Sequence, residues 1–231
     1  MKYKRILLKL SGETLSGKGG WGINSGALSS LVKEIRPLFN KKIQIAIVIG
    51  AGNIWRGATK KMDRVTADHM GMIATVMNAL ALKESLSKNG IPATVQSAFV
   101  VSDFVEKYSP QKAVKYLKKN KVVVFAGGTG KPFYTTDTTA ALRAKEIKAD
   151  VLLKATQVDG VYDSDPQKNK KAKRFASLSF AEALKRKLKV MDATAFHICG
   201  KRHLPIIVFN FHKKGNLVKV LDDPSIGTIV A

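Results

Sequence analysis

The strongest constraint on the fold is a pair of short apolar runs near the N-terminus, each of which leads directly into glycine. Tyr3–Leu10 is followed by Ser11-Gly12, and Ile43–Ile49 is followed by Gly50-Ala51-Gly52. Short, nearly uniform apolar runs bounded by turn residues are typical of strands buried on both faces. They predict a sheet that is largely parallel and covered by helices on both sides.

The rest of the chain continues this alternation of strand-like and helix-like segments. Such an order implies crossover connections, which join parallel strands. We therefore predict an α/β fold, a three-layer α/β/α sandwich with a mainly parallel central sheet. Asp159-Gly160 is a turn signal that predicts a hairpin. The other expected strands are Pro92–Val95, Val122–Phe125, Val151–Leu153, Ile206–Phe209 and Thr228–Val230, and the expected helices are Ser25–Phe39 after the cap residue Asn24 or Ser25, Ala67–Ser87, Asp137–Ile147, Ser179–Arg186 and Asp192–Lys201.

Length and cysteine usage limit the organisation of the protein. A chain of 231 residues with 45% hydrophobic content fits one domain over residues 1–231. The lone Cys199 cannot form an intramolecular disulfide, which favours a reducing compartment. No apolar run approaches the roughly 18 residues needed to cross a bilayer, and Lys9 interrupts the apolar N-terminal run. We expect a soluble, cytoplasmic protein.

The chain is strongly basic, with 40 Lys and Arg against 17 Asp and Glu and a formal charge of +23. Such a surplus attracts nucleic acid, anionic membranes or small phosphorylated ligands. The basic residues are scattered over Lys112–Lys121, Lys168–Arg174 and Lys185–Lys189, without the aromatic interleaving of a single-strand binding groove. A lysine-rich solvated surface explains them, so nucleic acid is not required as a partner. A nucleic-acid-binding module stays open as an alternative.

Three predicted strands end in small residues that expose the backbone: Ser11-Gly12-Glu13, Gly50–Asn53 and Gly127–Gly130. Glycine lets the backbone approach a ligand closely, so peptide N–H groups there can bind phosphate oxygens. One such loop is usually only a tight turn. Three in one open sheet lie at the same edge, where ligands gather. The sequence therefore predicts a phosphate site at this edge.

Familiar nucleotide fingerprints do not account for these loops. Gly127–Pro132 resembles a P-loop, but Pro132 stands where a hydroxyl must follow Gly-Lys. Gly50–Trp55 begins like a dinucleotide fingerprint, but Trp55 occupies the third glycine position. Protein-kinase signatures are absent, and the histidines show no metal-binding spacing. No protein metal ligand is predicted.

Charged residues near the loops suit phosphate binding. Lys9 lies inside an apolar run, where a buried ammonium needs an anion, although an edge-strand lysine pointing to solvent gives the same pattern. Arg56 follows the second glycine loop and can bind phosphate through two N–H groups. Lys154 closes a predicted strand, where a solvated lysine is again an alternative. Asp137 and Asp192 could each be a plain N-cap of the helix that follows.

These loops and charged residues fall within six segments: Lys9–Glu13, Gly50–Gly57, Asp68–Met72 with Ala74–Asn78, Gly128–Asp137, Lys154–Tyr162 and Lys189–Asp192. In this order they resemble the bacterial UMP kinases of the amino acid kinase superfamily. Lys-Leu-Ser-Gly alone indicates only the superfamily, which includes carbamate, acetylglutamate, glutamate and aspartate kinases. Asp68–Met72 and Gly128–Asp137 point to the UMP kinases.

The resemblance implies transfer of the γ-phosphoryl group of ATP to UMP in pyrimidine nucleotide biosynthesis, with Mg²⁺ bound mainly through ATP. It implies four catalytic residues: Lys9 and Lys154 would neutralise charge on the transferred group, and Asp137 and Asp192 would orient the lysines or the metal shell. The implied ATP-binding residues are Lys9, Leu10, Ser11, Gly12, Gly52, Arg56, Thr156, Tyr162 and Asp165. The implied UMP-binding residues are Ala51, Asp68, Thr129, Gly130, Lys131, Pro132, Phe133, Tyr134, Thr135 and Thr136.

Assembly and regulation are also implied by the resemblance. Members of this family are typically homohexamers, activated by GTP and inhibited by UTP. Gly17–Gly22 resembles a region associated with the GTP response, although a flexible surface loop is an alternative interpretation. Lys131 stands where relatives usually carry Asn, and Ala51 replaces a common glycine. A carbamate or carboxylate kinase, which needs no nucleoside pocket around Asp68, stays open as the nearest alternative.

Overall fold

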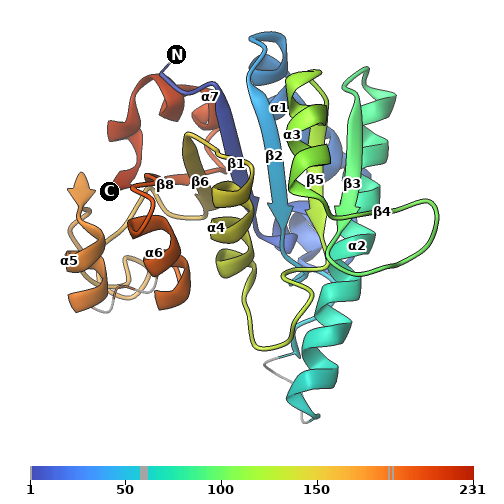
Figure 1. The fold of residues 1–231 in the computed structure, drawn as a ribbon. Helices are drawn as coiled ribbons and strands as arrows, with labels where there is room; N and C mark the ends of the chain where they lie inside the picture. Colours follow the sequence, from blue (N-terminus) through green and yellow to red (C-terminus); the bar gives the residue numbers. More distant parts are fainter. Residues whose placement is uncertain (1, 58–61, 187, 189) are drawn as a thin grey trace.

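A mainly parallel sheet forms the middle of the molecule, with helices on both of its faces (Figure 1). The structure, a computed structural model, describes residues 2–57, 62–186, 188 and 190–231. Within these residues nine strands lie in the order β4-β3-β5-β2-β1-β6-β8-β9-β7, and only the β8–β9 pair is antiparallel. The strands are β1 (Arg5–Leu10), β2 (Gln44–Ile49), β3 (Ala93–Ser97), β4 (Glu106–Lys107), β5 (Val122–Ala126), β6 (Val151–Thr156), β7 (Ser177–Leu178), β8 (Ile206–Asn210) and β9 (Thr228–Val230).

Two buried clusters separate the layers and confirm the predicted three-layer sandwich. Apolar side chains of α1, α2 and α7 pack on one face of the sheet, and those of α3, α4, α5 and α6 pack on the other. The helices are α1 (Ser25–Asn40), α2 (Arg64–Lys88), α3 (Pro110–Lys118), α4 (Thr136–Glu146), α5 (Phe180–Lys185), α6 (Ala193–Gly200) and α7 (Asn216–Asp222), with short 3-10 helices at η1 (Gly12–Leu15), η2 (Gly17–Gly19) and η4 (Pro224–Ile226).

Helix starts follow local capping chemistry. Asn24 caps α1 by accepting a hydrogen bond from the backbone N–H of Ala27, as the sequence predicts. Helix α2 begins three residues before the predicted Ala67, because Asp63 accepts from the N–H of Thr66 and caps the helix there. A side-chain cap, rather than the apolar pattern, therefore decides where α2 starts.

The sequence analysis did not predict helices α3 and α7. Helix α3 lies within the lysine-rich run that we interpreted as surface charge, yet Ala113 and Leu117, four residues apart, bury one of its sides. Helix α7 follows Gly215, whose φ of 79° provides a left-handed turn before the helix. Helix α3 has few buried residues among its lysines, and α7 is only seven residues long, so neither shows a clear helical period.

The predicted hairpin at Asp159-Gly160 is wrong. Strand β6 pairs in parallel with β1 and β8, and the chain beyond Gly160 does not return along it. Instead the N–H of Val161 donates to the hydroxyl of Thr228 at 2.9 Å, which draws this segment toward β9.

Lys189, the first residue of the Lys189–Asp192 segment, lies outside the described residues. Among the described helices, none combines the length and apolar character needed to cross a bilayer.

Candidate active site

Two lysines from neighbouring strands lie side by side at the carboxyl edge of the sheet. Lys9 in β1 and Lys154 in β6 are register partners, and partner residues of parallel strands project to the same face. Each side chain is only 12% exposed. Strand β1 lies between β2 and β6, so the interpretation of Lys9 as an edge-strand residue is wrong. The low exposure of Lys154 likewise excludes a solvated strand-end lysine.

Asp137 of α4 joins the two ammonium groups. Its Oδ1 lies 2.8 Å from Lys9 Nζ, its Oδ2 accepts from Lys154 Nζ at 2.5 Å, and Lys154 also donates to the carbonyl of Val190. Burial tends to raise the pKa of Asp137, but the charges of Lys9 and Lys154 outweigh it and hold the pKa below its ordinary value. Burial lowers the pKa of Lys154, and the attraction of Asp137 offsets part of this effect. Two ammonium groups share one carboxylate, an arrangement that favours a further anion.

The interpretation of Asp137 as a plain N-cap is wrong. Thr135 caps α4, because its hydroxyl accepts from the N–H groups of Asp137 and Thr138, and the Asp137 carboxylate is left to face the lysines. Asp192 does cap its helix, α6, by accepting from Ala195 N at 2.8 Å. Its carboxylate also accepts from the hydroxyls of Thr135 and Thr138, the latter at 2.9 and 3.0 Å. Asp192 therefore positions the start of α4. In the described structure it acts on the lysines indirectly, by holding the helix that carries Asp137.

The first two glycine loops are held together by their backbones. Gly50 N donates to the Leu10 carbonyl at 3.0 Å, and the Leu10 side chain is buried in the core, so Leu10 joins the loops rather than facing a ligand. Gly12 packs so closely against the second loop that an added Cβ would lie 2.3 Å from Asn53 Oδ1 and 2.7 Å from Gly52 N. The two loops thus form one continuous backbone surface beside the lysines.

A buried pair of asparagines fixes the second loop to α2. Asn53 Nδ2 donates to Asn78 Oδ1 at 2.9 Å, Asn78 Nδ2 donates to Asn53 Oδ1 at 2.8 Å, and Asn78 also donates to the Gly50 carbonyl at 2.8 Å. Sequence analysis assigned neither residue a role. A signal was available: Asn78 precedes Ala79 and Leu82 on the apolar side of a helix, where a buried amide requires partners.

Substitution of Gly12 by alanine tests the contact between the loops. We expect kcat/KM for ATP to fall about 100-fold, because the new methyl group must displace backbone atoms of the loops that are predicted to bind phosphate. Gly200→Ala is the matched control, since a Cβ on Gly200 would make only ordinary van der Waals contact with the Phe180 side chain, at 3.4 Å. Steady-state kinetics with varied ATP gives the comparison. Equal kinetics for the two variants would show that the close approach at Gly12 is not needed.

Arg56 contacts both of the paired glycine loops. Its Nε donates to the Gly52 carbonyl at 3.0 Å, and its guanidinium forms an ion pair with Glu13, just after the first loop. The sequence analysis gave Glu13 no role. This ion pair holds the guanidinium beside the backbone N–H groups that the loops present.

The third glycine loop belongs to a segment that extends to the start of α4, and α2 holds it in place. Gly127, Gly128 and Gly130 have φ values of 75°, 59° and 82°, which favour glycine. Asp68 of α2 accepts from the N–H of Phe133 at 2.7 Å and pairs with Arg64 at 3.0 Å. Between this loop and α2 lies a cavity of 190 Å³, whose lining includes Ala51, Asp68, Lys131, Tyr134 and Thr136.

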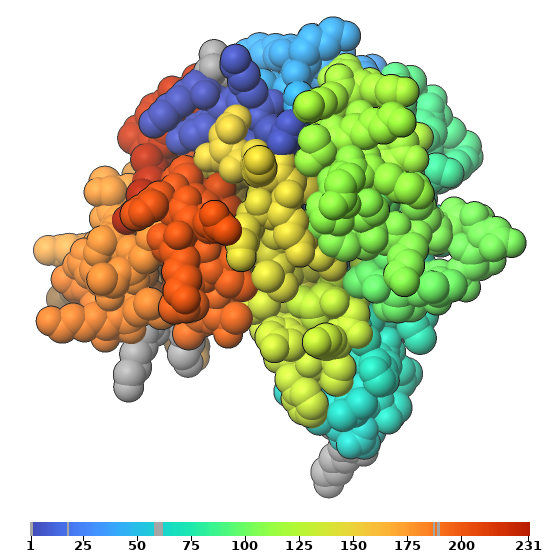
Figure 2. Space-filling model, viewed as in Figure 1, coloured from blue at the N-terminus to red at the C-terminus, as the bar shows by residue number. Residues whose placement is uncertain are grey.

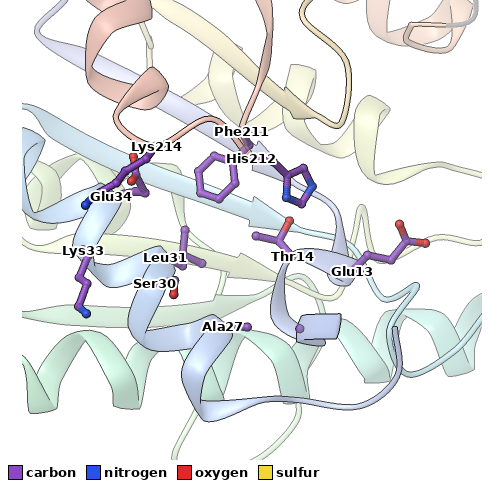
Figure 3. Close-up of a pocket in the computed structure, with 11 residues that line it drawn as sticks. Glu13, Thr14, Ala27, Ser30, Leu31, Lys33, Glu34, Phe211, His212 and Lys214 are labelled. Atoms are coloured by element: carbon purple, nitrogen blue, oxygen red, sulfur yellow. The ribbon is translucent and has the colours of Figure 1, made fainter. Parts of the chain in front are cut away.

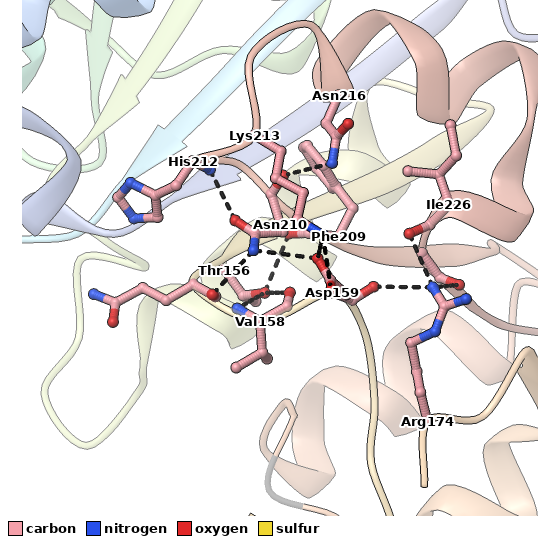
Figure 4. A network of polar contacts seen from close by, with 12 residues as sticks. Thr156, Val158, Asp159, Arg174, Phe209, Asn210, His212, Lys213, Asn216 and Ile226 are labelled. Atoms are coloured by element: carbon pink, nitrogen blue, oxygen red, sulfur yellow. Dashed lines mark hydrogen bonds and ion pairs between the residues drawn. The ribbon is translucent and has the colours of Figure 1, made fainter. Parts of the chain in front are cut away.

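A second cavity, of 610 Å³, lies beside β6 and is lined by Lys154, Thr156, Tyr162 and Asp165, among others. The Thr156 hydroxyl bonds to backbone at Val158 (2.7 Å) and Phe209 (3.1 Å), so it shapes the loop around the cavity. Nearby, Asp159 pairs with Lys213 at 2.8 Å, and Arg174 donates to backbone carbonyls, including that of Ile226 at 2.9 Å (Figure 4).

Each of the two cavities has a lining residue in or next to the Lys9–Asp137–Lys154 cluster. Lys154 lines the larger cavity, and Thr136, which precedes Asp137, lines the smaller one. In the space-filling view the outline of the molecule is notched between the orange segment around residues 160–200 and the yellow-green segment around residues 130–136 (Figure 2). The arrangement offers room for two ligands with positive groups between them.

A third cavity, of 660 Å³, has none of Lys9, Asp137 and Lys154 in its described lining, but it borders the first glycine loop through Glu13 and Thr14. Figure 3 shows Phe211 and His212 on one side of it, with Leu31 and Ser30 of α1 on the other. It lies on the α1 side of the sheet, whereas Lys9 and Lys154 face α4 through Asp137.

The same cleft-bearing fold recurs in known proteins. Residues 4–210 match the model of the amino acid kinase family. The UMP kinase from Bacillus anthracis is 36% identical, with 100% of this chain and 96% of that chain covered and a TM-score of 0.96. The UMP kinase from Ureaplasma parvum is 39% identical over 100% of both chains, with a TM-score of 0.93.

A more distant structure is the uridylate kinase from Archaeoglobus fulgidus, 28% identical, with 98% of this chain and 99% of that chain covered and a TM-score of 0.75. The family match and the full-length likenesses include every strand and loop that builds the cleft. The chain therefore belongs to the amino acid kinase family and, within it, to the UMP kinases.

Proposed function

We propose that this protein transfers the γ-phosphoryl group of ATP to UMP, forming UDP and ADP for pyrimidine nucleotide synthesis, and that residues 1–231 act as one kinase domain. The observation that carries the proposal is the buried Lys9–Asp137–Lys154 cluster: Lys154 lines one cavity, and Asp137 directly follows Thr136, which lines the other. ATP occupies the cavity beside β6, with its phosphates on the paired glycine loops. UMP occupies the cavity between Asp68 and the third glycine loop.

The chemistry needs positive charge more than it needs a base. The second pKa of a phosphate monoester is about 6, so an oxygen of UMP is already ionised at neutral pH. That oxygen attacks the γ phosphorus of ATP; a new P–O bond forms while the bond to the β–γ bridging oxygen breaks, and ADP leaves. Lys9 and Lys154 counter the repulsion between the two anions and stabilise the charge on the transferred group. Asp137 holds both ammonium groups in place.

We propose that Mg²⁺ enters bound to the phosphates of ATP. Two observations support this mode of binding: Asp137 is occupied by two lysines, and Asp192 by two threonines and a helix N–H. Among the described residues no group of three or more His, Cys, Asp or Glu side chains could hold a metal. When bound, the ion neutralises charge on the phosphate oxygens of ATP.

An acceptor panel tests the proposed function. ADP release from ATP is measured with UMP, CMP, dTMP, carbamate and glutamate, and UMP is expected to be the preferred acceptor. The CMP and dTMP arms also report whether Lys131, which adds charge to the UMP cavity, changes base choice. Turnover of carbamate or glutamate, with no turnover of UMP, would favour the alternative that the protein is a carbamate or carboxylate kinase. Salt-sensitive nucleic-acid binding with no turnover of any acceptor would favour the binding module.

We also propose that the protein assembles into a homo-oligomer, a hexamer by kinship with the family. An apolar stripe on α2 supports self-association: Met70, Ile73 and Met77 are spaced by three and four residues and are 38%, 56% and 51% exposed. Exposed apolar side chains at this spacing form one face of a helix.

GTP activation and UTP inhibition are proposed on the same kinship. What supports a regulatory role for Gly17–Gly22 is its bond to the phosphate loops: Gly22 N donates to the Asn53 carbonyl, and Asn53 Nδ2 donates back to the Gly22 carbonyl at 2.8 Å. A displacement of this segment would therefore reach the second glycine loop directly. The cytoplasm is proposed as the location, consistent with a lone buried cysteine.

A further inference from the structure

An arginine outside the proposed cleft is buried beneath the third glycine loop. Arg143 lies near the end of α4 and is only 6% exposed. A buried guanidinium is costly unless its charge and its N–H groups are satisfied. Nothing in the proposed chemistry uses this residue directly, so its burial requires another explanation.

Three partners hold the Arg143 guanidinium in one orientation. Its Cζ lies 3.6 Å from the centroid of the Tyr108 ring, and its Nη1 donates to Glu146 Oε2 at 2.8 Å. The Tyr108 hydroxyl donates to the same carboxylate oxygen, and burial raises the pKa of that hydroxyl, so it stays protonated. Tyr108 in turn packs edge-on against Phe125 of β5, with ring centroids 5.5 Å apart. The guanidinium plane is therefore held by the Tyr108 ring, which itself packs against the buried Phe125.

The remaining contact of Arg143 is with the UMP side of the site. Its Nη2 donates to the Gly128 carbonyl at 3.3 Å, and Gly128 lines the 190 Å³ cavity. The described peptide bonds are all trans, and in a trans peptide the C=O and N–H groups point in opposite directions. Because the Gly128 carbonyl points to Arg143, the N–H of Thr129 points away from it. Within the described structure, this N–H has no hydrogen-bond acceptor.

We propose that Arg143 is a positioning residue for the acceptor: by holding the Gly128 carbonyl, it orients the Gly128–Thr129 peptide so that the Thr129 N–H is presented to UMP. This inference rests on the proposed UMP kinase function. Lysine cannot replace arginine here, because a single ammonium group cannot stack on Tyr108 and also donate to both Glu146 and Gly128. The charge is thus less important than the planar fork.

Arg143→Lys is the decisive variant, since it keeps the charge and loses the fork; Arg143→Met removes both. We expect Arg143→Lys to raise the KM for UMP about tenfold, with the KM for ATP unchanged. Amide hydrogen exchange, followed by mass spectrometry on the folded variant, is expected to accelerate in peptides covering residues 128–134 and to stay unchanged in peptides covering β1 and β6.

Arg36→Lys is the matched control, because Arg36 also donates to a backbone carbonyl, that of Asn89, at the opposite end of α2 from the cleft. An Arg143→Lys enzyme with an unchanged KM for UMP, or with equal increases in the KM for both nucleotides, would overturn the positioning role. If Arg143→Met fails to fold, the measurement on Arg143→Lys still decides. If the wild-type enzyme does not phosphorylate UMP, the proposed function is wrong, and this inference fails with it.

Discussion

Replacing Lys9 by methionine is expected to lower kcat with UMP about 1,000-fold while leaving the fold intact. The methionine side chain matches the length of the lysine stem and suits a site that is 12% exposed, so packing is retained. With Lys9 gone, Asp137 pairs with Lys154 alone, and the site loses its surplus positive charge. Two anionic nucleotides then meet without the charge that counters their repulsion.

Enzyme-coupled ADP release, circular dichroism and thermal melting measure this outcome. Lys88→Met is the matched control, since Lys88 is 74% exposed and, among the described residues, forms its ion pair with Glu84 of its own helix. If both the control and the Lys9 variant are fully active, Lys9 has no role in the reaction. Loss of activity with a lost melting transition would instead indicate a structural role.

Asp137→Asn is expected to cost about 3 kcal/mol of folding free energy, because it leaves two buried ammonium groups without their shared anion. The attraction of Asp137 partly offsets the lowering of the Lys154 pKa by burial, so the substitution lowers this pKa further. Activity requires protonated Lys154. The alkaline limb of the pH–rate profile is therefore expected to move to lower pH in the variant.

The stability of this variant also has a predictable pH dependence. A lysine whose folded pKa lies below its unfolded pKa binds fewer protons in the folded state over the interval between them, so stability rises with pH there. The melting-temperature deficit of Asp137→Asn should consequently shrink as the pH rises above neutrality. Inorganic phosphate should raise its melting temperature more than that of the wild type. Glu84→Gln, which breaks an exposed pair, is the control; a pH-independent deficit unaffected by phosphate would contradict the prediction.

Local sequence patterns predicted much of the fold. The uniform apolar runs before Gly12 and Gly50 identified β1 and β2, and the alternation of elements predicted the three-layer sandwich. The pattern was insufficient where the buried stripe was short: α3 and α7 were missed, and the turn signal at Asp159-Gly160 led to a wrong hairpin. At Asp159-Gly160 a contact with the distant residue Thr228 outweighed the local turn preference.

The candidate site divides in the same way. Strand ends rich in glycine, and a lysine inside an apolar run, predicted a phosphate site at one edge of the sheet, and the structure brings Lys9, Asp137 and Lys154 together there. The roles of Asn78 and Arg143 could not be derived in this way, because each depends on a partner in a distant loop or strand.

Residue order alone settled which segments become buried strands, which loops expose their backbone and where positive charge enters the sheet, because burial and backbone freedom depend on neighbouring residues. Only the folded chain decided that Lys9 lies beside Lys154, that Thr135 and not Asp137 caps α4, and that Asp137 joins the two lysines. Strand register and helix packing bring Lys9 to Lys154 and Asp137, both more than 100 positions from it in the sequence. Local preferences specify each element, but the distances between charged groups exist only once the elements have packed together.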